Sequence, residues 1–198
     1  MQQQAPYFLG MGAAVLLVDA ASHRLPALLP PNLCAVLDTL LGHGVLTGLQ
    51  FALGSALGGG AAQARELGVL CGLVSVGMDA DHFLAAGSLS LRAAMALPSR
   101  PFAHSVAFLL LALALAAALA HRVLPPWAPH LLLCAFGGHQ LRDSLKRGLW
   151  LGPAALGSTP PTPYALYALL MAGAPLALAG PLRAAYQPPP LLPLTNPL

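Results

Sequence analysis

The stretch VAFLLLALALAAALA, residues 106–120, contains no polar or charged side chain and decides the class of the whole chain. With the few residues before it, it approaches the length of about 20 apolar residues that crosses a bilayer. The entire chain is 57% hydrophobic and only 8% charged, whereas soluble domains carry about 25% charged residues. Its 198 residues have room for six such helices and little else. The sequence therefore predicts an all-α, polytopic integral membrane bundle of about six transmembrane helices.

The predicted helices form a single transmembrane domain over residues 1–186, with loops rich in proline and glycine between them. The expected spans cover residues 6–21, 33–57, 67–86, 102–120, 127–147 and 164–182. The remaining residues, 187–198, form a proline-rich tail that is predicted to be disordered. Cys34, Cys71 and Cys134 lie in apolar runs without CxxC spacing, so we expect buried, inert thiols.

The positive charge of the chain is typical of the flanks of membrane helices. The net charge of +3 comes from nine Lys and Arg residues that lie mostly in short loops, so it does not indicate a nucleic-acid partner. Membrane lipid is the expected partner, and the sequence identifies no protein partner. Arg24, Arg92, Arg100, Arg142, Lys146 and Arg147 share the side of loops 22–32, 87–101 and 148–163, against three cations opposite. By the positive-inside rule, that side is predicted to be cytoplasmic.

Acids and imidazoles gather on this same side. An Asp at the centre of a membrane helix costs about 2.5 to 3.5 kcal/mol, so an ionisable residue there indicates function by default. Because successive spans alternate in direction, every helix end can be assigned to one face of the membrane. Nine residues fall on the side with the three loops: Asp19, Asp38, His43, Asp79, Asp81, His82, His104, His139 and Asp143. The opposite side has only Glu66, His121 and His130.

Carboxylates and imidazoles without cysteines favour a divalent metal such as zinc or manganese, or iron, with water in the open positions. His139 and Asp143 are four residues apart and share one helix face. Asp79 and His82 also lie near one face, whereas Asp81 is a ligand only if the helix ends there; otherwise it orients a ligand. On spacing alone, the candidate metal ligands are Asp79, His82, His139 and Asp143, with His43 as a further candidate.

A purely structural role would also account for acids and imidazoles at these positions. The acids and imidazoles could form buried ion pairs with Arg100, Arg142 or Lys146. His43 shares a polar stripe with Thr39, Thr47 and Gln50, where an interhelical hydrogen bond would also suit it. Asp19 and Asp38 are more typical of helix ends and polar stripes than of metal sites.

The motifs resemble two families. DADHFLAAGSLSLRAAMALPSRPFAH and HQLRDSLKRGLW are similar to the animal transmembrane protein 267 family. The order GH, DxDH, RxxxH and HxxxD, followed by a segment like LWxxP, resembles the bacterial membrane-bound metal-dependent hydrolase family. The second resemblance implies a metal site at the residues that match its pattern: His43, Asp79, Asp81, His82, His104, His139 and Asp143. The bacterial pattern has a further His just before the Arg, where this chain has Ser99. If that His is needed, metal binding or catalysis is weakened or lost here.

The sequence thus favours a metal-dependent hydrolase of a lipid or another membrane-embedded ester or phosphoester. His82, His104, His139 and Asp143 would hold the ion, and Asp79 or Asp81 would act as a ligand or as the general base. Arg100 and Arg142 would bind an anionic headgroup or steady a developing negative charge. The alternative is a non-enzymatic structural or adaptor protein, or a small transporter, with a vestigial metal site.

Overall fold

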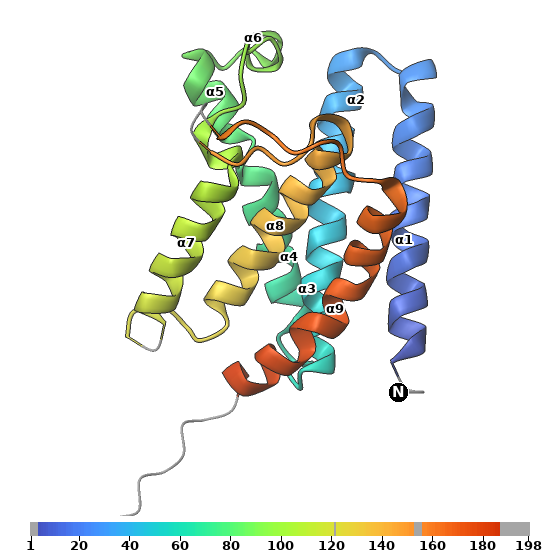
Figure 1. The fold of residues 1–198 in the computed structure, drawn as a ribbon. Coiled ribbons are helices and arrows are strands. Elements are labelled where there is room, and N and C mark those ends of the chain that lie inside the picture. Colours follow the sequence, from blue (N-terminus) through green and yellow to red (C-terminus); the bar gives the residue numbers. More distant parts are fainter. Residues whose placement is uncertain (1–3, 121, 153–155, 187–198) are drawn as a thin grey trace, which may run out of the picture.

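The computed structural model describes residues 4–120, 122–152 and 156–186, which form a bundle of long helices (Figure 1). The predicted disordered tail, 187–198, and His121 lie outside the described residues. The described part is built from helices joined by loops, which confirms the predicted all-α membrane class.

The helices follow the predicted spans, with interruptions near one end of the bundle. The first half of the chain contains α1 (Ala5–Arg24), the 3-10 turn η1 (Leu25–Ala27), α2 (Pro31–Leu37), the π-helix η2 (Asp38–Val45), α3 (Leu46–Leu57), α4 (Ala64–Gly77) and α5 (Ala80–Ala86). The second half contains α6 (Leu91–Met95), the 3-10 turn η3 (Phe102–His104), α7 (Val106–Leu119), α8 (Ala128–Arg147) and α9 (Tyr164–Tyr186). Elements α2, η2 and α3 run on as one continuous rod.

Four segments among the described residues are long and apolar enough to cross a membrane: Ala5–Ala27, Pro31–Leu57, Ala64–Ala86 and Tyr164–Tyr186. The other two predicted spans have different characters. Helix α7 is apolar throughout but shorter, and α8 is polar over its C-terminal half. The number of six spans therefore stays a prediction, whereas the helical membrane class is established.

Glycines allow α3 and α4 to pack closely along the middle of the bundle. A Cβ atom added to Gly48 would lie 2.8 Å from the carbonyl oxygen of Gly68, and one added to Gly72 would lie 2.6 Å from that of Gly44. Small residues at such spacing let two membrane helices approach until their backbones touch. This contact fixes the rod that carries His43 against the one that leads to Asp79.

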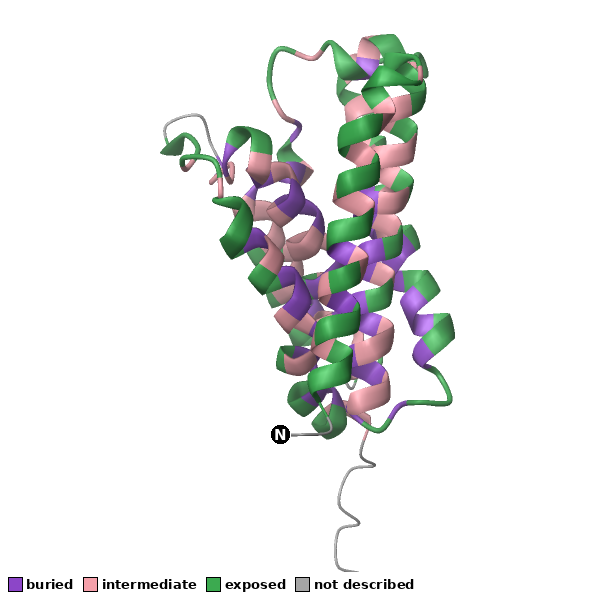
Figure 2. Ribbon diagram, turned by 90° about the vertical axis from the view of Figure 1, so that its right-hand side faces the viewer, coloured by how far each residue is buried: buried purple, intermediate pink, exposed green. Residues whose placement is uncertain are grey.

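Two groups of apolar side chains pack in the interior of the bundle. One group centres on Phe51, Cys71 and Leu182, and the other on Met11 and Tyr167. Figure 2 shows the buried residues along the inside of the bundle and the exposed ones on its outer faces. Many of the exposed side chains are leucines, which are well suited to contact lipid tails.

Candidate metal centre

The structure brings the seven predicted metal ligands together at one end of the bundle, in a set that we call the His–Asp cluster. They form three overlapping groups whose ligand atoms lie within 4.8 Å of one another. The groups are His43, His139 and Asp143; Asp79, His104 and His139; and Asp81, His82 and His104. The rods and turns that carry them are η2, the junction of α4 and α5, η3 and α8.

The middle group has the spacing of a metal site. The Nε2 atom of His104 lies 3.3 Å from Asp79 Oδ1 and 3.1 Å from His139 Nε2. The Nε2 atom of His139 lies 3.5 Å from the same Asp79 oxygen. A tetrahedral zinc ion with bonds of about 2.1 Å separates its ligand atoms by about 3.4 Å. These three atoms therefore match one face of a tetrahedron around a single ion.

Both imidazoles of this group are oriented by a partner on their other nitrogen. His139 Nδ1 lies 2.9 Å from the carbonyl oxygen of Ser75 and donates its proton there. His104 Nδ1 lies 3.0 Å from Asp81 Oδ2. Histidines that bind metals are held in this way by a carboxylate or a carbonyl, which fixes the ring and the tautomer. The arrangement directs both Nε2 atoms toward Asp79.

Asp81 acts in the structure as a partner of histidines. Helix α4 ends at Gly77 and α5 begins at Ala80, so the helix breaks just before Asp81. One Asp81 oxygen accepts from His104 and the other lies 3.0 Å from His82 Nδ1. The helix does end here, which is the condition under which the sequence predicts Asp81 as a ligand, but in the structure both of its carboxylate oxygens face histidines.

His104 precedes α7 and lies outside that apolar helix. Burial lowers the pKa of His104, but its hydrogen bonds to Asp79 and Asp81 outweigh burial and raise the pKa to about 9. At neutral pH without an ion, the ring is therefore protonated and offsets part of the negative charge of the two carboxylates. An ion that binds Nε2 takes the place of that proton.

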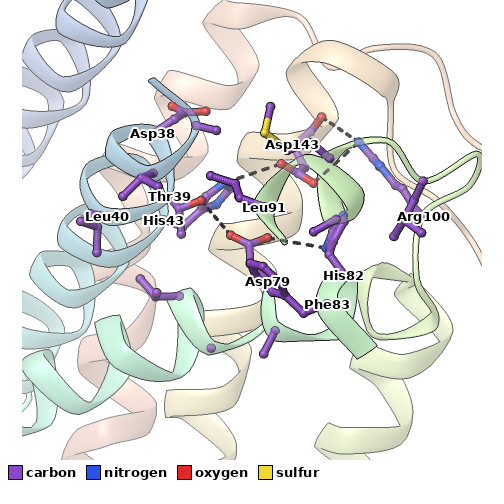
Figure 3. Close-up of a pocket in the computed structure, with 18 of the residues that line it drawn as sticks. Asp38, Thr39, Leu40, His43, Asp79, His82, Phe83, Leu91, Arg100 and Asp143 are labelled. Atoms are coloured by element: carbon purple, nitrogen blue, oxygen red, sulfur yellow. Dashed lines mark hydrogen bonds and ion pairs between the residues drawn. The ribbon is translucent and has the colours of Figure 1, made fainter. Parts of the chain in front are cut away.

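Asp143 is held from the loop side by Arg100. The guanidinium of Arg100 donates to the backbone carbonyls of Gly148 at 2.9 Å and of Asp143 at 3.1 Å. It also lies 3.8 Å from Asp143 Oδ2. These contacts leave Asp143 Oδ1 facing His43, as Figure 3 shows. Arg100 thus fixes the C-terminal end of α8 beside the cluster.

Arg142 lies in a second polar group next to the His–Asp cluster, which we call the arginine cluster: Arg142, Asp19, Ser22, Asp38 and Tyr167. Arg142 donates to Asp19, to Asp38 Oδ1 at 2.7 Å, to Ser22 Oγ at 3.2 Å and to Tyr167 Oη at 3.0 Å. It is buried and ties α8 to α1, η2 and α9. Because two carboxylates already engage it, Arg142 is poorly placed to bind the anion expected from the sequence.

The π-helix η2 packs closely against the guanidinium of Arg142 in the arginine cluster. A Cβ atom added to Gly42 would lie only 2.0 Å from Arg142 Nε, so this position of η2 admits the guanidinium only as glycine. π-helical turns are rare and are frequent at functional sites. The next residue is His43, so the same turn that receives Arg142 also aims an imidazole at the His–Asp cluster.

A cavity of about 660 Å³ opens beside the His–Asp cluster. Its polar lining includes His43, Asp79, His82 and Asp143 (Figure 3). Its apolar wall is formed by Val36, Leu40, Phe83, Leu91, Met95 and Leu97. Arg100, Lys146 and Arg147 add positive charge to the lining. The sequence motifs do not predict Lys146 and Arg147 as site residues. They follow Asp143 by three and four positions, however, and so share its helix face.

Comparisons with known proteins find similarity to several vertebrate membrane proteins. The chain is 29% identical to transmembrane protein 267 of Mus musculus over 167 residues, which cover 81% of this chain and 74% of that protein. It is 34% identical to transmembrane protein 267 of Bos taurus, over 54% of this chain and 51% of the relative. The protein of that name in Danio rerio is 38% identical, over 54% and 49%.

The chain thus spans about half the length of two of these curated relatives. Their shared name supports an integral membrane location and states no activity. No family model matches the chain, and no solved structure matches it.

Proposed function

We propose that this membrane protein is a metal-dependent hydrolase that acts on a lipid or another membrane-embedded ester or phosphoester. The observation that carries the proposal is the spacing of Asp79 Oδ1, His104 Nε2 and His139 Nε2, at 3.1 to 3.5 Å from one another. Three protein ligands with one open position are typical of catalytic zinc sites, whereas structural sites use four.

The bound ion would supply an activated water, because a metal with an open position lowers the pKa of its water to about 7. The side chains of the protein would hold the ion and orient its ligands. Asp79, His104 and His139 would hold the ion, and Asp81 would keep His104 in the tautomer that presents Nε2. Asp79 is thus assigned as a ligand and Asp81 as a positioning residue.

The cavity supports a lipid as the substrate. It combines an apolar wall with a cationic part formed by Arg100, Lys146 and Arg147. An acyl chain would contact the wall, while guanidinium groups bind phosphate oxygens in a bidentate manner. Arg100 and Arg147 therefore replace Arg142 in the proposed headgroup site. The cation excess at this end of the bundle favours the cytoplasmic leaflet as its location.

One observation favours a non-enzymatic structural protein as the second candidate. The cluster already satisfies much of its own hydrogen bonding, since Asp79 and Asp81 both bond to His104 without an ion. Such a network could join helices as an adaptor or structural bundle does. The two candidates differ in whether the purified protein carries a metal.

The experiment is a measurement of metal content on the full chain purified in detergent, with inductively coupled plasma mass spectrometry. We expect at least one zinc or manganese ion per chain. The same preparation should hydrolyse phosphatidic acid or phosphatidylcholine in mixed micelles, lose this activity to a chelator and regain it with the metal. A folded protein without stoichiometric metal would contradict the proposal and leave the structural bundle.

Removing the carboxylate of Asp81 should weaken metal binding without removing a ligand. We expect Asp81→Asn to lower the metal affinity by about 10- to 100-fold, the usual effect of losing a partner that orients a metal-binding histidine. Competition with a fluorescent chelator measures this affinity. Glu66→Gln is the matched control, because it removes one carboxylate from the exposed start of α4. Equal affinities in the two variants would contradict the orienting role of Asp81.

A further inference from the structure

His43 has no hydrogen-bond partner that explains its burial. The residue is only 5% exposed, and its ring stacks on that of His139 with 3.7 Å between centroids. Within the described part of the chain, His43 Nδ1 is buried without a hydrogen-bond partner. Its Nε2 atom faces Asp143 Oδ1 at 3.6 Å, which is too long for a hydrogen bond. Burial of a polar atom without a partner is unfavourable, so the surroundings of His43 need an explanation.

The gap between His43 and Asp143 has the length expected between two ligands of one ion. Ligand atoms at about 2.1 Å from a tetrahedral ion lie about 3.4 Å apart, close to the 3.6 Å observed. His139 also lies within reach of these atoms. Its Nε2 lone pair, however, points to the Asp79–His104 group and can bind only one ion. An ion between His43 and Asp143 would therefore be distinct from the ion at His139.

Asp79 is placed to connect the two positions. Its Oδ1 atom belongs to the group with His104 and His139. Its Oδ2 atom accepts a hydrogen bond of 2.9 Å from Thr39, which lies on η2 together with His43 (Figure 3). One oxygen of this carboxylate thus belongs to the group with His104 and His139, and the other is directed toward η2, the element that carries His43.

We infer that the centre binds two divalent metal ions, one at Asp79, His104 and His139 and a second at His43 and Asp143, with Asp79 between them. The inference rests on the proposed function, because it adds an ion to the one already proposed. The number of ligands supports it, since a tetrahedral ion takes four ligands and the five residues named here exceed what one ion can bind.

Two ions beside a cavity lined by Arg100, Lys146 and Arg147 favour a phosphoester as the substrate. Paired ions about 3.5 to 4 Å apart are typical of phosphatases and nucleases, where they stabilise the entering and leaving oxygens of an in-line displacement at phosphorus. Arg100 lies 3.8 Å from Asp143 Oδ2 and lines the same cavity. It is therefore close enough to contact a phosphate oxygen of a lipid bound at the second position.

The test is the number of ions per chain in the wild type and in His43→Gln, measured on protein reloaded with Mn²⁺. We expect two ions in the wild type and one in His43→Gln, with an exchange-coupled electron paramagnetic resonance signal only in the wild type. Asp143→Asn is a second variant with the same expected loss. Circular dichroism and gel filtration verify that each variant is folded.

The outcomes separate the two proposals. One ion in the wild type, unchanged in His43→Gln, would overturn the second site and leave the hydrolase proposal standing. A folded wild type that binds no ion would overturn both. Loss of both ions in a folded His43→Gln protein would mean one shared site, and would also overturn this inference.

Discussion

Replacing Arg142 by alanine is expected to destabilise the bundle by about 3 to 5 kcal/mol, the usual effect of removing one partner from a buried ion pair. The side chain of Arg142 is 8% exposed, and that of its partner Asp19 is 14% exposed. Without the guanidinium, the carboxylates of Asp19 and Asp38 face each other with no buried cation between them. Thermal or denaturant unfolding in detergent, followed by circular dichroism, measures the change.

Lys146→Ala is the control for this prediction. Lys146 lies on the same helix and contacts the same Asp38, at 3.5 Å, but its side chain is 79% exposed. An exposed ion pair contributes about 0 to 1 kcal/mol, so this variant should remain close to the wild type. Arg142→Met combined with Asp19→Asn and Asp38→Asn should recover part of the stability. Equal losses in Arg142→Ala and Lys146→Ala would contradict the structural role of the arginine cluster.

The fold could be predicted from the sequence because apolar runs of membrane length are hard to explain in any other way. The predicted boundaries of 33–57 and 164–182 lie close to the helices Pro31–Leu57 and Tyr164–Tyr186. The π-helical turn at Asp38–Val45 could not be predicted in the same way. It packs at Gly42 against Arg142, a residue a hundred positions away in the chain. Local propensity carries no signal for such a contact.

The alternating directions of successive helices were enough to predict that the acids and imidazoles lie at one end of the bundle. The set of proposed metal ligands could not be predicted in this way, because it depends on which ring nitrogen of each histidine faces the other ligands. The carbonyl of Ser75 sets the orientation of His139, and a backbone acceptor has no residue signature. Its position beside His139 and Asp143 predicts that Arg142 binds an anion, yet its guanidinium bonds to Asp19 of α1 and Asp38 of η2.

The structure also shows where Ser99 lies relative to the proposed ion site. Ser99 lines the cavity beside the His–Asp cluster. The group of Asp79, His104 and His139 forms one tetrahedral face without any ligand from position 99. The proposed ion site therefore takes no ligand from position 99, and Ser99 belongs to the lining of the cavity beside it.

His139→Ala is expected to remove the ion held by Asp79, His104 and His139 and to lower hydrolysis by at least about 100-fold. His139 is fully buried and is one of the three residues that would hold this ion. Loss of a direct ligand should exceed the effect of about 10- to 100-fold that follows the loss of an orienting partner. Metal content after gel filtration and the rate of lipid hydrolysis measure the two effects separately.

His130→Ala is the matched control for His139→Ala, since it removes a histidine from the first part of the same helix. It should keep the wild-type metal content. Circular dichroism distinguishes loss of metal from loss of fold, because a purely structural His139 would lower the unfolding temperature without changing any bound ion. If folded His139→Ala retains the full metal content, the three-ligand site is wrong, whatever the remaining activity.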